Sequence, residues 1–145
     1  MRENLQVYLY PSMVLFGKGV KIMKFYRCKK CGKVVTVLGE DVSSLFCENA
    51  ETEELIPNTT DAAGEKHVPV ITKDGAKVHV AVGSVEHPML ENHYIMFIVL
   101  ETKNGVQRQD LKPGMKPAAD FVLAEGDEVV AAYEYCNLHG LWRGE

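Results

Sequence analysis

The sequence lacks the features that mark membrane-spanning, disulfide-built and nucleic-acid-binding proteins. Its longest uninterrupted apolar run is seven residues, Tyr94–Leu100, whereas a membrane-spanning helix needs about 20. Four cysteines in 145 residues are too few for a small secreted scaffold held by disulfides. A formal charge of −4 provides no general attraction for nucleic acid or an anionic membrane. These shortages favour one ordinary domain with a small appendage, in the reducing cytoplasm and without nucleic-acid or membrane partners.

The first 22 residues read differently from the rest of the chain. Their loosely apolar stretch, Leu5–Phe16, is interrupted by polar residues and proline, and no small-residue cleavage pattern follows it, which argues against a signal peptide. Lys18-Gly19-Val20 is what an in-frame ribosome-binding sequence would encode, and it lies just ahead of Met23. We therefore expect residues 1–22 to be a translated leader or a disordered extension.

Residues 23–56 are predicted to form a small module around a cysteine turn. Lys24–Leu38 indicates two short strands on either side of Cys28-Lys29-Lys30-Cys31-Gly32, and glycine suits a tight turn with positive φ. The stretch 48–65 is rich in acidic residues and holds few large apolar side chains, which indicates a solvated linker.

Residues 57–145 are predicted to form an all-β domain. Val78, Val80 and Val82 alternate with more polar residues, and the preceding Asp74-Gly75 pair is a strong hairpin signal. Tyr94 to Glu101 is nearly continuously apolar, which is typical of a central strand. Six short, regularly spaced strands without a helical period favour an antiparallel β-sandwich.

Four of the five histidines and one cysteine fall in predicted loops of this domain. These candidate ligands are His67, His87, His93, Cys136 and His139. Imidazoles with one thiolate suit iron, copper or zinc. Structural zinc closes with four ligands, so five favour a square-pyramidal iron site with one open face. A non-catalytic zinc- or copper-binding β-sandwich and a small electron-transfer protein are the alternatives.

Four stretches carry a resemblance to a known family. They are Asn58-Thr59-Thr60-Asp61-Ala62-Ala63, Glu65-Lys66-His67-Val68-Pro69-Val70, Ser84-Val85-Glu86-His87-Pro88-Met89 and Cys136-Asn137-Leu138-His139-Gly140. They resemble the superoxide reductases, the desulfoferrodoxins and neelaredoxins, over residues 58–145. The resemblance implies an immunoglobulin-like β-sandwich that reduces superoxide to hydrogen peroxide by one electron. It also implies one iron per chain, with the four histidines equatorial and Cys136 axial.

The same resemblance assigns roles to two charged residues and to partners. It implies that Glu65 binds the sixth position of resting ferric iron, and that Lys66 attracts superoxide and helps to deliver protons. It implies a rubredoxin-like electron donor, and we expect a homo-oligomer, either a dimer or a tetramer. His79 matches no ligand motif and is predicted to be a surface residue, while Trp142 is predicted to serve in packing.

The N-terminal cysteines resemble a desulforedoxin-type module, with one departure. Cys28, Cys31 and Cys47 match three of the four thiolates with which that module holds iron, but Glu48 stands where the fourth is expected. We predict a degenerate module without iron, and both zinc binding and free thiols stay open. Because residues 58–145 contain all five other ligands, we also expect the module to be dispensable for their site.

Overall fold

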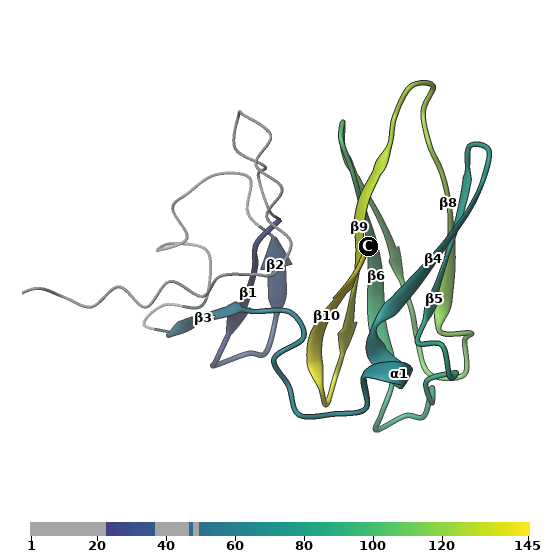
Figure 1. Ribbon diagram of the computed structural model, residues 1–145. Coiled ribbons are helices and arrows are strands. Elements are labelled where there is room, and N and C mark those ends of the chain that lie inside the picture. Colours follow the sequence, from purple (N-terminus) through teal and green to yellow (C-terminus); the bar gives the residue numbers. More distant parts are fainter. Residues whose placement is uncertain (1–22, 37–46, 48–49) are drawn as a thin grey trace, which may run out of the picture.

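The computed structural model describes residues 23–36, 47 and 50–145 (Figure 1). The predicted leader, residues 1–22, lies outside the described residues. The described strands form three antiparallel sheets, ordered β2-β1-β3, β4-β5-β8 and β10-β9-β6-β7. None of the helices in the described part of the chain has the length and hydropathy to cross a membrane.

The elements follow one another as short strands with one helical turn. Their bounds are β1 (Phe25–Cys28), β2 (Val34–Thr36), β3 (Thr52–Leu55), α1 (Gly64–His67), β4 (Pro69–Asp74), β5 (Lys77–Val82), β6 (Ile95–Thr102), β7 (Val106–Asp110), β8 (Ala118–Val122), β9 (Val129–Cys136) and β10 (Gly140–Gly144).

Strands β4 to β10 form the predicted immunoglobulin-like sandwich. Lettered A to G in chain order, they pair as A-B-E in one sheet and G-F-C-D in the other. Constant-type immunoglobulin domains pair as ABED and CFG, so here the fourth strand has moved beside the third. Between the sheets lies an apolar core that includes Val80 of β5, Ile98 of β6 and Phe121 of β8. The predicted fold class is confirmed.

Strand β10 was not among the six predicted strands. Its segment is short and has glycine at both ends, and glycine weakens a strand considered alone. The strand forms because it pairs with β9, Leu141 opposite Tyr135 and Trp142 opposite Glu134. Its inner side lies so close to β4 that a Cβ on Gly144 would meet the Pro69 carbonyl oxygen.

The prediction of a solvated linker over residues 48–65 is wrong for residues 52–55, which form strand β3. Residues 52–55 lie within the stretch 48–65, yet they form the third strand of the N-terminal sheet beside β1. The acidic residues of the stretch pair with lysines at either end of β1: Glu54 lies 3.3 Å from Lys24, and Glu51 lies 2.8 Å from Lys29. The strand therefore depends on a partner more than 20 positions earlier, which local composition does not reveal.

Phe25 of β1 joins this N-terminal sheet to the sandwich. Its ring centroid lies 6.3 Å from that of Phe97 and 5.1 Å from that of Tyr133, and the side chain is buried. Together with Val99, Tyr135 and neighbouring residues, these rings form a second apolar core. Strand β6 is thus covered on both faces, which explains its nearly continuous apolar sequence. In Figure 1 the N-terminal sheet lies beside β9 and β10.

Candidate metal centre

The five predicted ligands meet at one end of the sandwich, close to α1. His67 is the last residue of α1, His87 and His93 lie between β5 and β6, Cys136 ends β9, and His139 lies in the turn before β10. The expectation that all five fall in loops is therefore wrong for His67 and Cys136. Both stand at the last position of a regular element, where the chain turns, and this holds them more firmly than a loop would.

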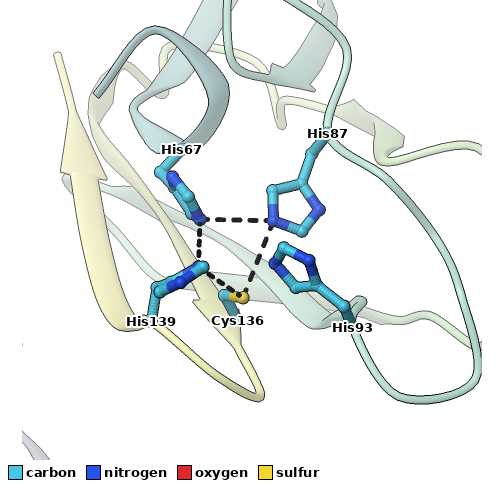
Figure 2. Close-up of side chains that lie close together, drawn as sticks. All are labelled: His67, His87, His93, Cys136 and His139. Atoms are coloured by element: carbon cyan, nitrogen blue, oxygen red, sulfur yellow. Dashed lines mark hydrogen bonds between the residues drawn. The ribbon is translucent and has the colours of Figure 1, made fainter. Parts of the chain in front are cut away.

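Figure 2 shows the five side chains pointing toward one another. One ligand atom from each lies within 4.8 Å of all the others. Nε2 of His67 is 3.2 Å from Nε2 of His87 and 3.0 Å from Nδ1 of His139. The sulfur of Cys136 is 3.6 Å from Nε2 of His87. Adjacent nitrogens held at about 2.1 Å from one ion lie about 3 Å apart, so the cluster has the dimensions of a coordination sphere.

Hydrogen bonds at the backs of two rings fix which nitrogen faces inward. Nδ1–H of His67 donates to the carbonyl oxygen of Ala63 at 2.7 Å, and Nδ1–H of His87 donates to that of Pro88 at 2.6 Å. Because a carbonyl oxygen only accepts, the proton of each neutral ring sits on Nδ1. The two Nε2 lone pairs then face each other at 3.2 Å, which is unfavourable until a cation lies between them. Such backbone contacts typically orient metal-binding histidines.

Burial keeps the imidazoles of the cluster neutral, which is the form that binds a metal, and it keeps Cys136 a thiol that must lose its proton when a cation binds. Desolvation lowers the pKa of His87 to about 4, and it is also the main cause of the lowered pKa values of His67 and His93. Burial raises the pKa of the Cys136 thiol. His93 Nε2 is buried without a hydrogen-bond partner among the described residues. Neutral imidazoles, an unpartnered nitrogen and a buried thiol fit a metal cation.

Glu65 and Lys66 directly precede the candidate ligand His67 in α1. Both side chains are exposed on α1, next to the buried His67. The pKa of His93 is lowered first by burial, then by the charge of His139, and then by that of Lys66. The positive charge of Lys66 thus disfavours protonation of His93.

Gly83 holds α1 in place. Its backbone has φ of 78°, a conformation that favours glycine. A Cβ there would lie 2.6 Å from the Glu65 carbonyl oxygen and 2.7 Å from the Lys66 carbonyl carbon. The Val85 N–H also donates to the Glu65 oxygen at 2.9 Å. The loop after β5 thus packs directly on the backbone that carries His67.

Replacing Gly83 with alanine is expected to reduce both stability and metal content. Backbone strain alone costs roughly 1–3 kcal/mol, and the clash with α1 would also displace His67. The matched control is Gly75→Ala, since Gly75 has φ of 60° and a Cβ added there would have nothing within 4 Å. Thermal unfolding and metal analysis of the two variants separate the clash from the strain. Equal losses of stability and metal in both would refute the role of Gly83.

Two other sequence predictions agree with the structure. His79 is exposed on β5, with Nδ1 2.7 Å from a carboxylate oxygen of Asp120 and away from the cluster. Trp142 is buried and stacks on His67 at a centroid distance of 4.8 Å, while its Nε1–H donates to the carbonyl oxygen of His139. The indole thus packs against two of the candidate ligands.

Sequence reasoning missed two residues close to the cluster. The Asn137 side chain accepts from the Tyr94 backbone N–H and donates to the Asn92 carbonyl oxygen, so it ties the turn after β9 to the loop of His93. Glu134 is fully buried and neither carboxylate oxygen has a hydrogen-bond partner among the described residues. Desolvation raises its pKa well above the usual range. Its position two residues before Cys136, on the same face of β9, was the available signal.

A β-sandwich that gathers four imidazoles and one thiolate at one end defines a class of mononuclear non-haem metal proteins. Comparison with known proteins narrows this class, because residues 59–145 match the family model described as Desulfoferrodoxin. The chain belongs to the desulfoferrodoxin family.

Individual relatives extend the similarity beyond the sandwich. The desulfoferrodoxin of Desulfarculus baarsii is 46% identical over 123 residues, which cover 85% of this chain and 96% of the relative. The desulfoferrodoxin homolog of Archaeoglobus fulgidus is 43% identical, with 85% and 97% covered. Among solved structures, the crystal structure of the superoxide reductase from Treponema pallidum is similar with a TM-score of 0.72 and 36% identity, covering 83% of this chain and 98% of that one.

The N-terminal thiols also lie together. The ligand atoms of Cys28, Cys31 and Cys47 are within 4.8 Å of one another, which fits the degenerate desulforedoxin-like module. Glu48, which takes the place of the fourth thiolate in the sequence, lies outside the described residues.

Proposed function

We propose that this protein is a superoxide reductase, an oxidoreductase that converts superoxide, one electron and two protons into hydrogen peroxide. The observation that carries the proposal is the convergence of four imidazoles and one thiolate within 4.8 Å, in a chain of the desulfoferrodoxin family. Relatives named superoxide reductase include those of Treponema pallidum and Pyrococcus furiosus.

We assign the five converging side chains as ligands of one iron ion per chain. The inward nitrogens are Nε2 of His67, His87 and His93 and Nδ1 of His139, joined by the Cys136 sulfur. Iron bound there supplies the one-electron chemistry, since its ferrous form can give up the electron that superoxide needs. A thiolate donates more electron density to iron than imidazole does, and the four neutral rings leave the site cationic. Both properties favour an anionic oxidant as substrate.

The open side of the cluster is where we place the substrate. His67, His87 and Cys136 are buried, whereas His93 and His139 are partly exposed, so solvent reaches the cluster past the latter two. Lys66 attracts the superoxide anion to this side and orders the water that supplies protons. Glu65, next to it, would supply a carboxylate ligand to the ferric form of the iron. These two are the residues we assign to catalysis.

The test is an anaerobic metal analysis combined with a superoxide assay that follows hydrogen peroxide and oxygen together. We expect one iron per chain, and peroxide formation without oxygen evolution when an electron donor is supplied. Zinc or copper in place of iron, without activity, would establish the metal-binding alternative. An iron centre whose spectrum does not respond to azide or cyanide would favour the electron-transfer alternative, because its coordination would be saturated.

The remaining expectations belong to the same proposal. We infer a sandwich domain at residues 57–145 and an N-terminal module at residues 23–56, because the five-ligand cluster lies wholly within the first. We also propose that a rubredoxin-like protein is the electron donor. The protein would form a homodimer or a homotetramer and act in the cytoplasm. Size measurement in solution and a donor assay with reduced rubredoxin test the first two.

A further inference from the structure

Asn137 lies where the pairing of β6 with β9 ends. Ile95 at the start of β6 is paired with Cys136 at the end of β9, and beyond this point the chain turns toward His139. The Asn137 backbone N–H donates to the Tyr94 carbonyl oxygen at 3.1 Å, and its side-chain oxygen accepts from the Tyr94 N–H at 2.9 Å. Both backbone polar groups of Tyr94 are therefore bonded to one residue, as they would be to a neighbouring strand.

The same side chain also reaches the residue before His93. Its Nδ2–H donates to the Asn92 carbonyl oxygen at 3.1 Å, so the amide holds the backbone on both sides of His93. Because an N–H only donates and a carbonyl oxygen only accepts, the amide fits in one orientation alone. Leu90 and His93 also exchange two backbone hydrogen bonds, of 2.9 and 3.1 Å. The backbone that carries the His93 ring is thus fixed from two directions.

Within the described residues, the His93 ring lacks the kind of hydrogen bond that orients two other candidate ligands. Backbone carbonyl oxygens hold the rings of His67 and His87 through Nδ1. Nε2 of His93 is buried without a partner, and no dashed line reaches its ring in Figure 2. Its ring contacts are with His87 and His139, at centroid distances of 4.6 and 5.0 Å. Since such contacts are less directional than a hydrogen bond, the direction of this ring depends on its backbone.

We propose that Asn137 is the positioning residue for His93, which it holds at the distance from Cys136 that one iron ion requires. The inference rests on the iron site of the proposed function. Asn137 directly follows one candidate ligand and fixes the backbone on both sides of another. One side chain therefore joins the connection between β5 and β6 to the turn between β9 and β10. Outer-shell contacts of this kind orient the ligands of metal sites.

The test compares how readily full-length, iron-loaded variants give up their iron to a chelator, and records their spectra. In Asn137→Ala we expect the iron affinity to fall about 10- to 100-fold, the range typical of losing an outer-shell contact. The thiolate-to-iron band should shift, and the electron paramagnetic resonance spectrum of the ferric protein should change, because it reports the symmetry of the ligand set. Gln107→Ala is the matched control: this amide donates to the Val122 carbonyl oxygen at 2.8 Å from β7, outside the cluster. It should keep the affinity and both spectra of the parent.

A second variant keeps the test decisive where the alanine variant does not fold. Asn137→Ser has a side chain too short to span both backbone groups, and it should show the same spectral changes. Parent-like spectra in the folded variants, with or without a loss of thermal stability, would reduce Asn137 to a structural role and overturn the proposal. Failure of the proposed function would appear in the parent itself, as a site that takes no iron or forms no peroxide. Failure of this inference appears only in the comparison between variants.

Discussion

The variant Cys136→Ser is expected to lose the visible thiolate-to-iron charge-transfer band completely. Superoxide reduction should fall by more than about 100-fold, since the change removes a ligand rather than an outer-shell contact. Cys136 is fully buried in the core between the two sheets of the sandwich, so no thiol of the N-terminal module can take its place. A serine hydroxyl has a far higher pKa than a thiol and donates less electron density. Visible spectroscopy and a peroxide-detecting assay measure the two losses.

Matched variants separate this effect from general damage. Cys47→Ser removes a thiol of the module and should keep the band and the activity. For the histidine ligands, His67→Ala should lose iron, whereas His79→Ala should keep it, because His79 is exposed and contacts Asp120 instead. A loss of iron in His79→Ala, or a band that persists in Cys136→Ser, would show that the ligand assignment is wrong.

The variant Lys66→Ala is expected to slow the second-order reaction with superoxide while keeping its iron. The protein carries −4 overall, so its mean field repels an anion and a fast reaction needs a local positive focus. Lys66 is exposed on α1, and its charge reaches His93. Electrostatic steering changes association rates by roughly 10- to 1000-fold and weakens with salt. The rate should fall within that range, and its salt dependence should flatten.

Lys77→Ala provides the matched control for net charge. Lys77 is an exposed lysine at the start of β5, whereas the loop that carries His87 and His93 follows the other end of that strand. Both alanine variants change the net charge by the same amount, so only local charge distinguishes them. Lys66→Arg should keep most of the rate. Rates that are equal in Lys66→Ala and Lys77→Ala would reduce Lys66 to an ordinary surface charge.

The candidate centre was predictable because its signals are local. The pairs His87 with His93 and Cys136 with His139 are each closely spaced along the chain; the first pair lies in one connection between strands, and the second spans the end of β9 and the turn that follows it. Residues that are close along the chain stay close in space whatever the rest of the fold is, so their spacing can be recognised from the sequence alone. Alternating valines in β5 and the Asp74-Gly75 turn likewise depend on neighbours only, and they led to the correct sandwich.

The missed features depend on partners that are distant in the sequence. Strand β3 exists because β1 pairs with it, and β10 exists because β9 does. The contact of Gly83 with α1 joins two segments on opposite sides of β4 and β5. Glu134 looks like any polar residue in a strand until the second sheet closes over its face. In each case the contact that stabilises the feature joins residues far apart in the sequence, so no local pattern predicts it.

The aromatic contact of Phe25 couples the stability of the N-terminal module to that of the sandwich. Its ring covers Phe97 and Tyr133 on the outer face of the sheet that contains β6 and β9, and Cys136 is the last residue of β9. Deleting the module would expose these rings to water and leave an apolar surface prone to self-association. The module is therefore less dispensable for solubility than the positions of the iron ligands suggest.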